Sequence, residues 1–120
     1  MREKKDLGDF GERLAFGLLR KEGYKILENN FRSRLGEIDI VAVDGDTLVF
    51  VEVKTRWSEE FGPPEEAVTS RKLRSIAKAG AYFRLLHQNL PEAERIDVVA
   101  IEIGKDGKVF RKELIKNATS

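Results

Sequence analysis

Apolar residues return every three or four positions in two segments of the chain, a spacing that places them on one face of a helix. Residues 9–22 show this spacing and are followed by Gly23, a residue suited to ending a helix. Residues 71–88 show it again, and Thr69 or Ser70 can cap the first turn. The pattern therefore predicts two amphipathic helices, one near the start of the chain and one in its second half.

Shorter apolar runs, bounded by glycine, proline and polar residues, predict five strands. These strands are residues 24–28, two within 36–56 that a tight turn joins, 95–103 and 108–114. The polar segment 29–36 is expected to be a loop. Residues 56–67 are also expected to be a loop, because Gly62, Pro63 and Pro64 interrupt them.

The order α-β-β-β-α-β-β predicts an α/β domain with a mixed β-sheet flanked by helices. The second helix connects the third and fourth strands, and a crossover of this kind usually makes the two strands parallel. No repeat, low-complexity segment or linker divides the chain, so we expect one domain spanning residues 1–120.

The composition limits the classes of function. Of the 120 residues, 41% are hydrophobic, enough for one compact core, and none is cysteine, which excludes disulfides and thiolate metal sites. The chain lacks an apolar signal core and a run of transmembrane length, so we expect a cytoplasmic protein with no membrane partner. Charged residues make up 36% of the chain, but the net charge is only +1. Nucleic-acid binding must therefore be argued from where the cations lie.

Four charged residues interrupt the two strands of the predicted hairpin, where acidic residues and lysine are normally depleted. They are Glu37, Asp39, Glu52 and Lys54. Side chains alternate along a strand, so all four project from one face if the turn has two residues. With Asp44–Gly45 as the turn, Glu37 lies opposite Glu52, and with Gly45–Asp46, Asp39 lies opposite Glu52. A three-residue loop without a bulge would divide the four between the two faces.

The first predicted helix contributes a further carboxylate. Glu12 lies inside the apolar arc of this helix, between Phe16 and Leu19, and we expect the helix to cover part of the charged face of the hairpin. The alternative is a capping pattern formed by Asp9 and Glu12, with Glu12 at the third helical position.

Carboxylates held this close repel one another unless one keeps a proton or a divalent cation neutralises them. Oxygen ligands without histidine or cysteine suit Mg²⁺ or Mn²⁺. Lys54 follows Glu52 by about 7 Å along the strand, and phosphodiester hydrolysis uses an ammonium beside a metal ion. Each charge also has a structural explanation, such as an exposed Glu52–Lys54 pair or an edge-strand Asp39. Their joint placement on one face favours a site.

Cationic residues gather in two segments near these acids. The second helix carries Arg71, Lys72, Arg74 and Lys78, and the hairpin is flanked by Arg32, Arg34 and Arg56. A solvated helix face explains the first group as readily as contacts with phosphates do. Trp57 can stack on a base or pack under the loop that contains Gly62, Pro63 and Pro64, and packing is favoured.

Asp39, followed by Glu52-Val53-Lys54 on the neighbouring strand and preceded by a helix bearing Glu12, resembles the PD-(D/E)XK nuclease superfamily, although Ile38 stands where that name has proline. A closer similarity is to the YraN-like family of uncharacterised bacterial proteins, which are predicted endonucleases. The segments that carry it span nearly the whole chain: residues 11–15, 32–42, 50–56, 67–76 and 95–101.

This resemblance implies a restriction-endonuclease-like core, similar to that of archaeal Holliday junction resolvases. It implies that Asp39 and Glu52 bind the metal, that Lys54 is the catalytic lysine, and that Glu12 is a further ligand or positions water. Lys72 falls where the family pattern carries lysine and is a candidate phosphate contact. Branched DNA as the substrate and a homodimer follow by analogy.

Three functions therefore stay open. The first is an Mg²⁺-dependent endonuclease that acts on DNA. The second is a nucleic-acid-binding or scaffolding protein that has the same fold and little or no turnover. The third is a protein-interaction module with a structural ion-pair cluster. Metal affinity, salt-dependent DNA binding and cleavage distinguish them.

Overall fold

The computed structural model describes residues 4–58 and 62–119. Its elements are α1 (Lys4–Lys21), β1 (Lys25–Ser33), β2 (Gly36–Asp44), β3 (Thr47–Trp57), a short 3-10 helix η1 (Pro64–Ala67), α2 (Ser70–Leu86), β4 (Ala93–Ile103) and β5 (Val109–Ile115). The predicted order of helices and strands is confirmed. The predicted domain, 1–120, and the predicted loop at 56–67 both include residues outside the described ranges.

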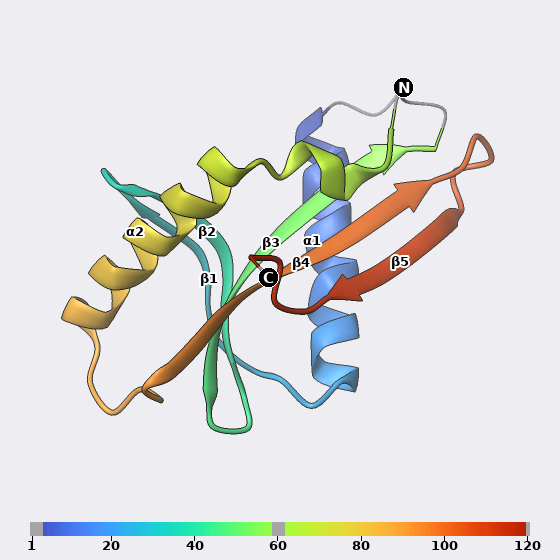
Figure 1. Cartoon of the computed structure of the whole chain (residues 1–120). Helices are drawn as coiled ribbons and strands as arrows, with labels where there is room; N and C mark the ends of the chain where they lie inside the picture. The colour runs from blue at the N-terminus through green and yellow to red at the C-terminus, as the bar shows by residue number, and fades with distance from the viewer. Residues whose placement is uncertain (1–3, 59–61, 120) are drawn as a thin grey trace.

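The strands form one mixed sheet in the order β1-β2-β3-β4-β5. β3 and β4 are parallel, as the crossover through α2 predicts, and the other neighbouring pairs are antiparallel. α1 packs on one face of the sheet and α2 on the other (Figure 1). Within the described part of the chain, no helix is long and apolar enough to cross a membrane.

The central strand β3 divides its side chains between two hydrophobic cores because they alternate along the strand. On the α1 side, Val49 and Val51 pack with Ala15 and Leu19. On the α2 side, Leu48 and Phe50 pack with Ile76 and Phe83. All eight side chains are at most 1% exposed. Trp57 packs against the α1-side core, so it is a packed side chain, although its predicted place was under the loop of Gly62, Pro63 and Pro64.

Several boundaries differ from the sequence prediction, two of them by five residues. α1 begins at Lys4 rather than at residue 9. β1 continues to Ser33, through a segment for which the sequence predicts a loop. Asn30 has a positive φ of 54°, and the register shifts between Ile26 and Glu28, so β1 bends while it stays paired with β2. As an edge strand, β1 can leave its polar side chains in solvent.

α2, not α1, covers the face of the hairpin that carries Glu52 and Lys54. The expectation that the first helix covers this face is wrong, because these two residues alternate with those that face α1. They line a cleft with residues of α2, on the same side as Leu48 and Phe50. The helix that connects the parallel strands therefore also borders the candidate site.

A buried polar network joins the turn end of the hairpin to β4 and to the C-terminal segment. Asp97 is fully buried and accepts hydrogen bonds from the Tyr24 hydroxyl at 2.7 Å and from the Asn117 backbone N–H at 3.0 Å. Arg95 donates to Asp97 at 3.0 Å and to Asp44 at 2.6 Å. Each charge has a partner, which is the condition for keeping charges inside a protein. The network fixes the end of β2 that lies farthest from the candidate site.

α2 lies close to the sheet because Gly80 has no side chain. A Cβ atom added to Gly80 would overlap the ring of Phe50, which is itself fully buried. Gly17 in α1 differs, because a Cβ atom there would meet no described atom within 4 Å. The two helical glycines therefore separate the effect of close packing from the effect of helix propensity.

Replacement of these two glycines by alanine tests the close approach of α2. Gly80→Ala is expected to lower the free energy of unfolding by about 1–3 kcal/mol, because overpacking moves the ring or the helix. Gly17→Ala is the matched control and is expected to raise it by up to about 1 kcal/mol, since alanine favours the helix. Urea unfolding measures both values. Equal stabilities of the two variants would contradict the contact with Phe50.

Candidate active site

The hairpin turn consists of Gly45 and Asp46, because Asp44 pairs with Thr47. Gly45 has a positive φ of 63°, as tight hairpin turns require. This turn is the second of the two that the sequence allows. The backbone pairing of β2 with β3 runs from this turn to Ile40 opposite Val51, so the next residues on the two strands are Asp39 and Glu52.

Asp39 lies where β2 separates from β3. Its Oδ2 atom accepts a hydrogen bond from the backbone N–H of Val53 at 2.8 Å. In a continued ladder that N–H would bond to the carbonyl of Ile38. β2 also twists here, since Ile38 packs in the α2-side core and Ile40 in the α1-side core. The Asp39 side chain thus takes the place of a backbone acceptor, and this hydrogen bond holds its carboxylate against β3.

Glu52 is paired with Asp39 through a hydrogen bond between their carboxyl groups. Glu52 is 9% exposed, and burial, followed by the negative charge of Asp39, raises its pKa to about 8. Burial also raises the pKa of Asp39, against the effect of the bond from Val53. At neutral pH the two carboxyl groups therefore hold one proton between them.

Glu12 approaches this pair from α1. It lies well inside α1, so the alternative that it caps the helix is wrong. Gly11 allows the approach, because a Cβ atom there would overlap the Thr55 hydroxyl of β3. Burial and then the charge of Asp39 raise the pKa of Glu12, while a hydrogen bond from the Asn30 side chain lowers it. The sequence pattern of the hairpin does not identify Asn30 as a partner of Glu12, because this hydrogen bond depends on the bend in β1.

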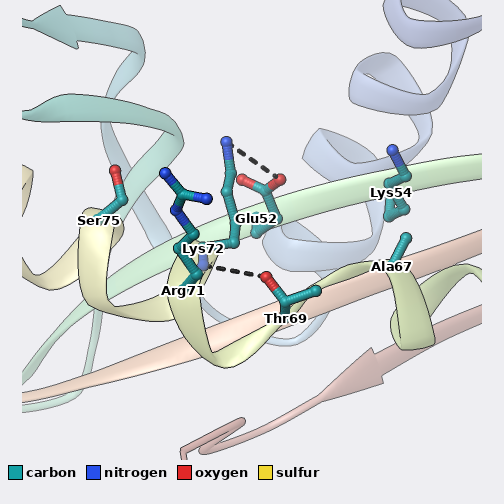
Figure 2. A pocket seen from close by; sticks show the side chains of 7 residues that line it. All are labelled: Glu52, Lys54, Ala67, Thr69, Arg71, Lys72 and Ser75. Carbon is teal, nitrogen blue, oxygen red and sulfur yellow. Dashed lines mark hydrogen bonds and ion pairs between the residues drawn. The ribbon is translucent and has the colours of Figure 1, made fainter.

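A cleft of about 430 Å³ opens between β3 and the first turns of α2 (Figure 2). Its lining combines acidic, basic and small side chains: Glu52, Lys54, Ala67, Thr69, Arg71, Lys72 and Ser75. Thr69 caps α2, and its hydroxyl accepts the backbone N–H of Lys72 at 3.2 Å. The cap confirms the predicted start of the helix and places two cationic residues of the first turn at the cleft.

Lys72 is the cation nearest to the carboxyl pair in this cleft. Its Nζ atom lies 3.9 Å from Glu52 Oε2, and Figure 2 shows the two side chains pointing toward each other while Lys54 stands farther along β3. The charge of Lys72 lowers the pKa of Glu52 more than the charge of Lys54 does. It also lowers the pKa of Asp39. Sequence motifs indicated Lys72 only as a phosphate contact, whereas the structure brings it to the carboxylates.

The other predicted cations are spread over several surfaces. Arg71 lines the cleft, whereas Arg74 lines a separate depression beside the C-terminal segment. Arg32 lies close enough to Glu12 to lower its pKa, and it lines a further depression with Arg34. Arg56 is partly buried near the end of β3. Glu37 is exposed, and its charge raises the pKa of Asp39.

The donor chemistry of the carboxyl pair fits a hard divalent cation. Carboxylate oxygens suit Mg²⁺ and Mn²⁺, and a bound cation would favour the ionised forms that burial disfavours. Among the side chains that the structure describes, however, no three of the histidine, aspartate and glutamate residues come close enough together to form a metal site. Asp39 and Glu52 are therefore two adjacent candidate ligands, and Glu12 is a nearby carboxylate outside the pair.

The sequence matches the model of the uncharacterised protein family UPF0102 over residues 11–101. The chain belongs to this family. The match includes every residue of the carboxylate site described above and confirms the similarity to YraN-like bacterial proteins. Membership in UPF0102 indicates common descent, and it assigns no activity.

Individual UPF0102 proteins resemble this chain over almost their whole length. The protein of Caldicellulosiruptor saccharolyticus is 45% identical, across 96% of this chain and 98% of its own. The protein of Geobacter metallireducens is 51% identical, across 95% of this chain and 92% of its own. A third, from Syntrophomonas wolfei, is 51% identical, across 87% of this chain and 90% of its own. The chain is thus comparable in extent to these UPF0102 proteins.

The shared proton predicts how stability depends on pH. Between about pH 5 and pH 8 the folded protein holds a proton on Glu52 that the unfolded chain, with the ordinary pKa of 4.5, releases. Stability should therefore fall as pH rises through this range, by at most about 1.4 kcal/mol per pH unit. Glu52→Gln removes the titrating group and should flatten the dependence. Urea unfolding of both proteins in EDTA measures it, and parallel pH profiles would contradict the assignment.

Proposed function

We propose that this protein is a metal-dependent nuclease that hydrolyses phosphodiester bonds in DNA. The observation that carries the proposal is the pair formed by buried Glu52 and half-buried Asp39, with Glu52 lining an open cleft beside Lys72 and Lys54. Burial of two carboxyl groups is unfavourable unless a proton or a cation neutralises them. A pair of this kind in a core strand favours a binding role over a purely structural one.

The carboxylates are the proposed ligands of Mg²⁺ or Mn²⁺. Asp39 and Glu52 would hold the ion, with Glu12 as a further ligand or as a group that positions water. The bound ion would supply Lewis-acid chemistry, which polarises a phosphate and lowers the pKa of water. Asp39 keeps its orientation through the Val53 N–H, so one ligand is fixed before any ion binds.

The cations of the cleft act on the phosphate. Lys54 lies on the same side of β3 as Glu52 and is the candidate for stabilising the charge that grows on the phosphate oxygens. Lys72 pairs with Glu52 in the free protein, and it becomes available to a phosphate once another cation neutralises Glu52. Arg71 borders the same cleft and adds a further phosphate contact.

The order of elements and the position of the carboxylates support a restriction-endonuclease-like core within the PD-(D/E)XK superfamily. The site lies on two adjacent strands of a mixed sheet that has a helix on each face, and the crossover helix α2 borders it. By analogy with junction resolvases, we extend the proposal to branched DNA and to a homodimer in the cytoplasm.

A second candidate function is nucleic-acid binding or scaffolding with little or no turnover. Two observations favour it: the net charge is only +1, and no three acidic side chains of the described residues form a metal site. Cleavage distinguishes the two functions, because both require DNA binding and only the nuclease requires the ion.

Cleavage assays with variants of the carboxyl pair test the nuclease directly. Labelled duplex, single-stranded and four-way-junction DNA are incubated with Mg²⁺, Mn²⁺ or EDTA. We expect metal-dependent cutting that Asp39→Ala and Glu52→Ala each reduce at least about 100-fold, because each removes a ligand. Glu22→Ala, at an exposed site beyond the end of α1, is the control. Full activity of both site variants would remove this site from the mechanism. Salt-sensitive binding without cutting would favour the second function.

Variants of the two lysines separate their roles. Lys54→Ala should lower the cleavage rate by about 10²–10³-fold with metal affinity kept, because lysine is not a ligand. Lys72→Ala should shift the pH–rate profile to higher pH, since the charge that lowers the pKa of Glu52 is lost. Arg74→Ala is the matched control, because Arg74 shares the helix but lies outside the cleft. An unchanged pH profile for Lys72→Ala would contradict its coupling to Glu52.

A further inference from the structure

A second depression lies beside the carboxylate cleft, at the end of the β1–β2 hairpin. It has a volume of about 460 Å³ and is lined by Arg32, Ser33, Arg34, Leu35 and Tyr82. The lining combines two cations, an aromatic ring and an aliphatic side chain, and it contains no carboxylate. Its charge is therefore opposite to that of the Asp39–Glu52 pair.

One electrostatic interaction and one hydrogen bond connect this depression to the candidate active site. Arg32 lies near enough to Glu12 for its charge to lower the pKa of that carboxyl. Ser75, which lines the carboxylate cleft, donates a hydrogen bond from its hydroxyl to the carbonyl of Leu35 at 3.3 Å. Gly36 allows this contact, because a Cβ atom there would overlap Ser75. The end of the hairpin thus rests on α2 between the two depressions.

The apolar side chains of the depression are exposed to solvent. Leu35 is 51% exposed and Tyr82 is 38% exposed. The Tyr82 ring leans on Phe31 at 6.2 Å between centroids, with 39° between the ring planes. Phe31 is buried and packs edge-on against Phe83 at 5.2 Å, so the core supports Tyr82 from one side. The opposite side of an aromatic ring held in this way can accept a flat partner.

An aromatic ring beside two arginines is a combination that binds single-stranded nucleic acid. The ring stacks on an unpaired base, and the arginines contact the adjoining phosphates. A base inside a duplex is already stacked on its neighbours and does not present its face to such a ring. A site of this kind therefore selects unpaired bases rather than any DNA of the same charge.

We propose that the depression formed by Arg32, Arg34, Leu35 and Tyr82 binds an unpaired base of the DNA strand whose phosphate lies in the carboxylate cleft. The proposal rests on the proposed function and narrows its substrate class to DNA with single-stranded or unpaired segments. Tyr82 stacks on the base, Leu35 covers its edge, and the two arginines bind the phosphates on either side.

The test measures binding of fluorescein-labelled oligothymidine and of a fully paired duplex by anisotropy, in EDTA so that no cleavage occurs. Tyr82→Ala is expected to weaken oligothymidine binding by about 5-fold to 150-fold, the loss of one base stack. Duplex affinity should stay close to that of the unmodified protein. Tyr82→Phe keeps the ring and should bind oligothymidine normally. Phe110→Ala is the matched control, since Phe110 is 71% exposed on β5 at the opposite edge of the sheet.

Arg34→Ala supplies a variant that should leave the stability of the fold nearly unchanged, because Arg34 is exposed at the hairpin turn. It should reduce the dependence of log Kd on log salt concentration for oligothymidine by about 0.7, the loss of one phosphate contact. Lys105→Ala, at the exposed turn between β4 and β5, is the control for this charge and should leave the slope unchanged.

Each outcome decides the matter. Selective loss of oligothymidine binding in Tyr82→Ala, with thermal unfolding like that of Tyr82→Phe, supports the proposal. Equal affinity of Tyr82→Ala and the unmodified protein, or equal losses for both DNA forms, overturns it and leaves the nuclease proposal intact. Absence of binding to either DNA by the unmodified protein overturns both.

Discussion

The hydrogen bond from the Val53 N–H to the Asp39 carboxylate is the interaction on which the candidate site depends. Up to Ile40 and Val51 the two strands pair through their backbones, and beyond that point a side chain provides the acceptor. This substitution keeps a buried N–H satisfied while β2 turns away from β3. It also brings a carboxylate next to Glu52, so the candidate site begins at the residue where regular backbone pairing of the two strands ends.

The remaining parts of the site follow from the two-sided packing of β3. The odd-numbered side chains Val49 and Val51 pack with α1, and the even-numbered side chains Leu48 and Phe50 pack with α2. Gly11 and Gly80 bring the two helices unusually close to the sheet, at Thr55 and Phe50. Glu12 lies on α1 and Lys72 on α2, so the two side chains approach from opposite faces of the sheet. Lys72 reaches Glu52 directly, whereas Glu12 lies near enough to Asp39 for the charge of Asp39 to raise its pKa.

The sequence predicts the hairpin part of the site well, because strand periodicity and a two-residue turn fix which side chains share a neighbourhood. Asp39 and Glu52 are brought together as one of the two possible turns requires. Lys72 was less predictable, since its distance from Glu52 depends on how α2 lies across the sheet. The sequence pattern did not indicate Asn30, because a left-handed residue lets β1 continue through a polar segment that resembles a loop. The pattern also placed the start of α1 at the Asp9–Glu12 capping motif, whereas the helix begins at Lys4 and Glu12 lies in its middle. Local pattern thus specifies the strands, and long-range packing specifies what surrounds them.

The network of Arg95, Asp97, Asp44 and Tyr24 gives the hairpin a mechanical asymmetry. At the turn end, β2 is bonded to β3 by the ladder and to β4 by Arg95. At the other end, Asp39 joins β2 to β3 through its side chain, with hydrogen bonds to the Val53 N–H and to Glu52. The register of the hairpin is thus set by backbone bonds at the turn, whereas the distance between the two carboxyl groups is set by side-chain contacts alone.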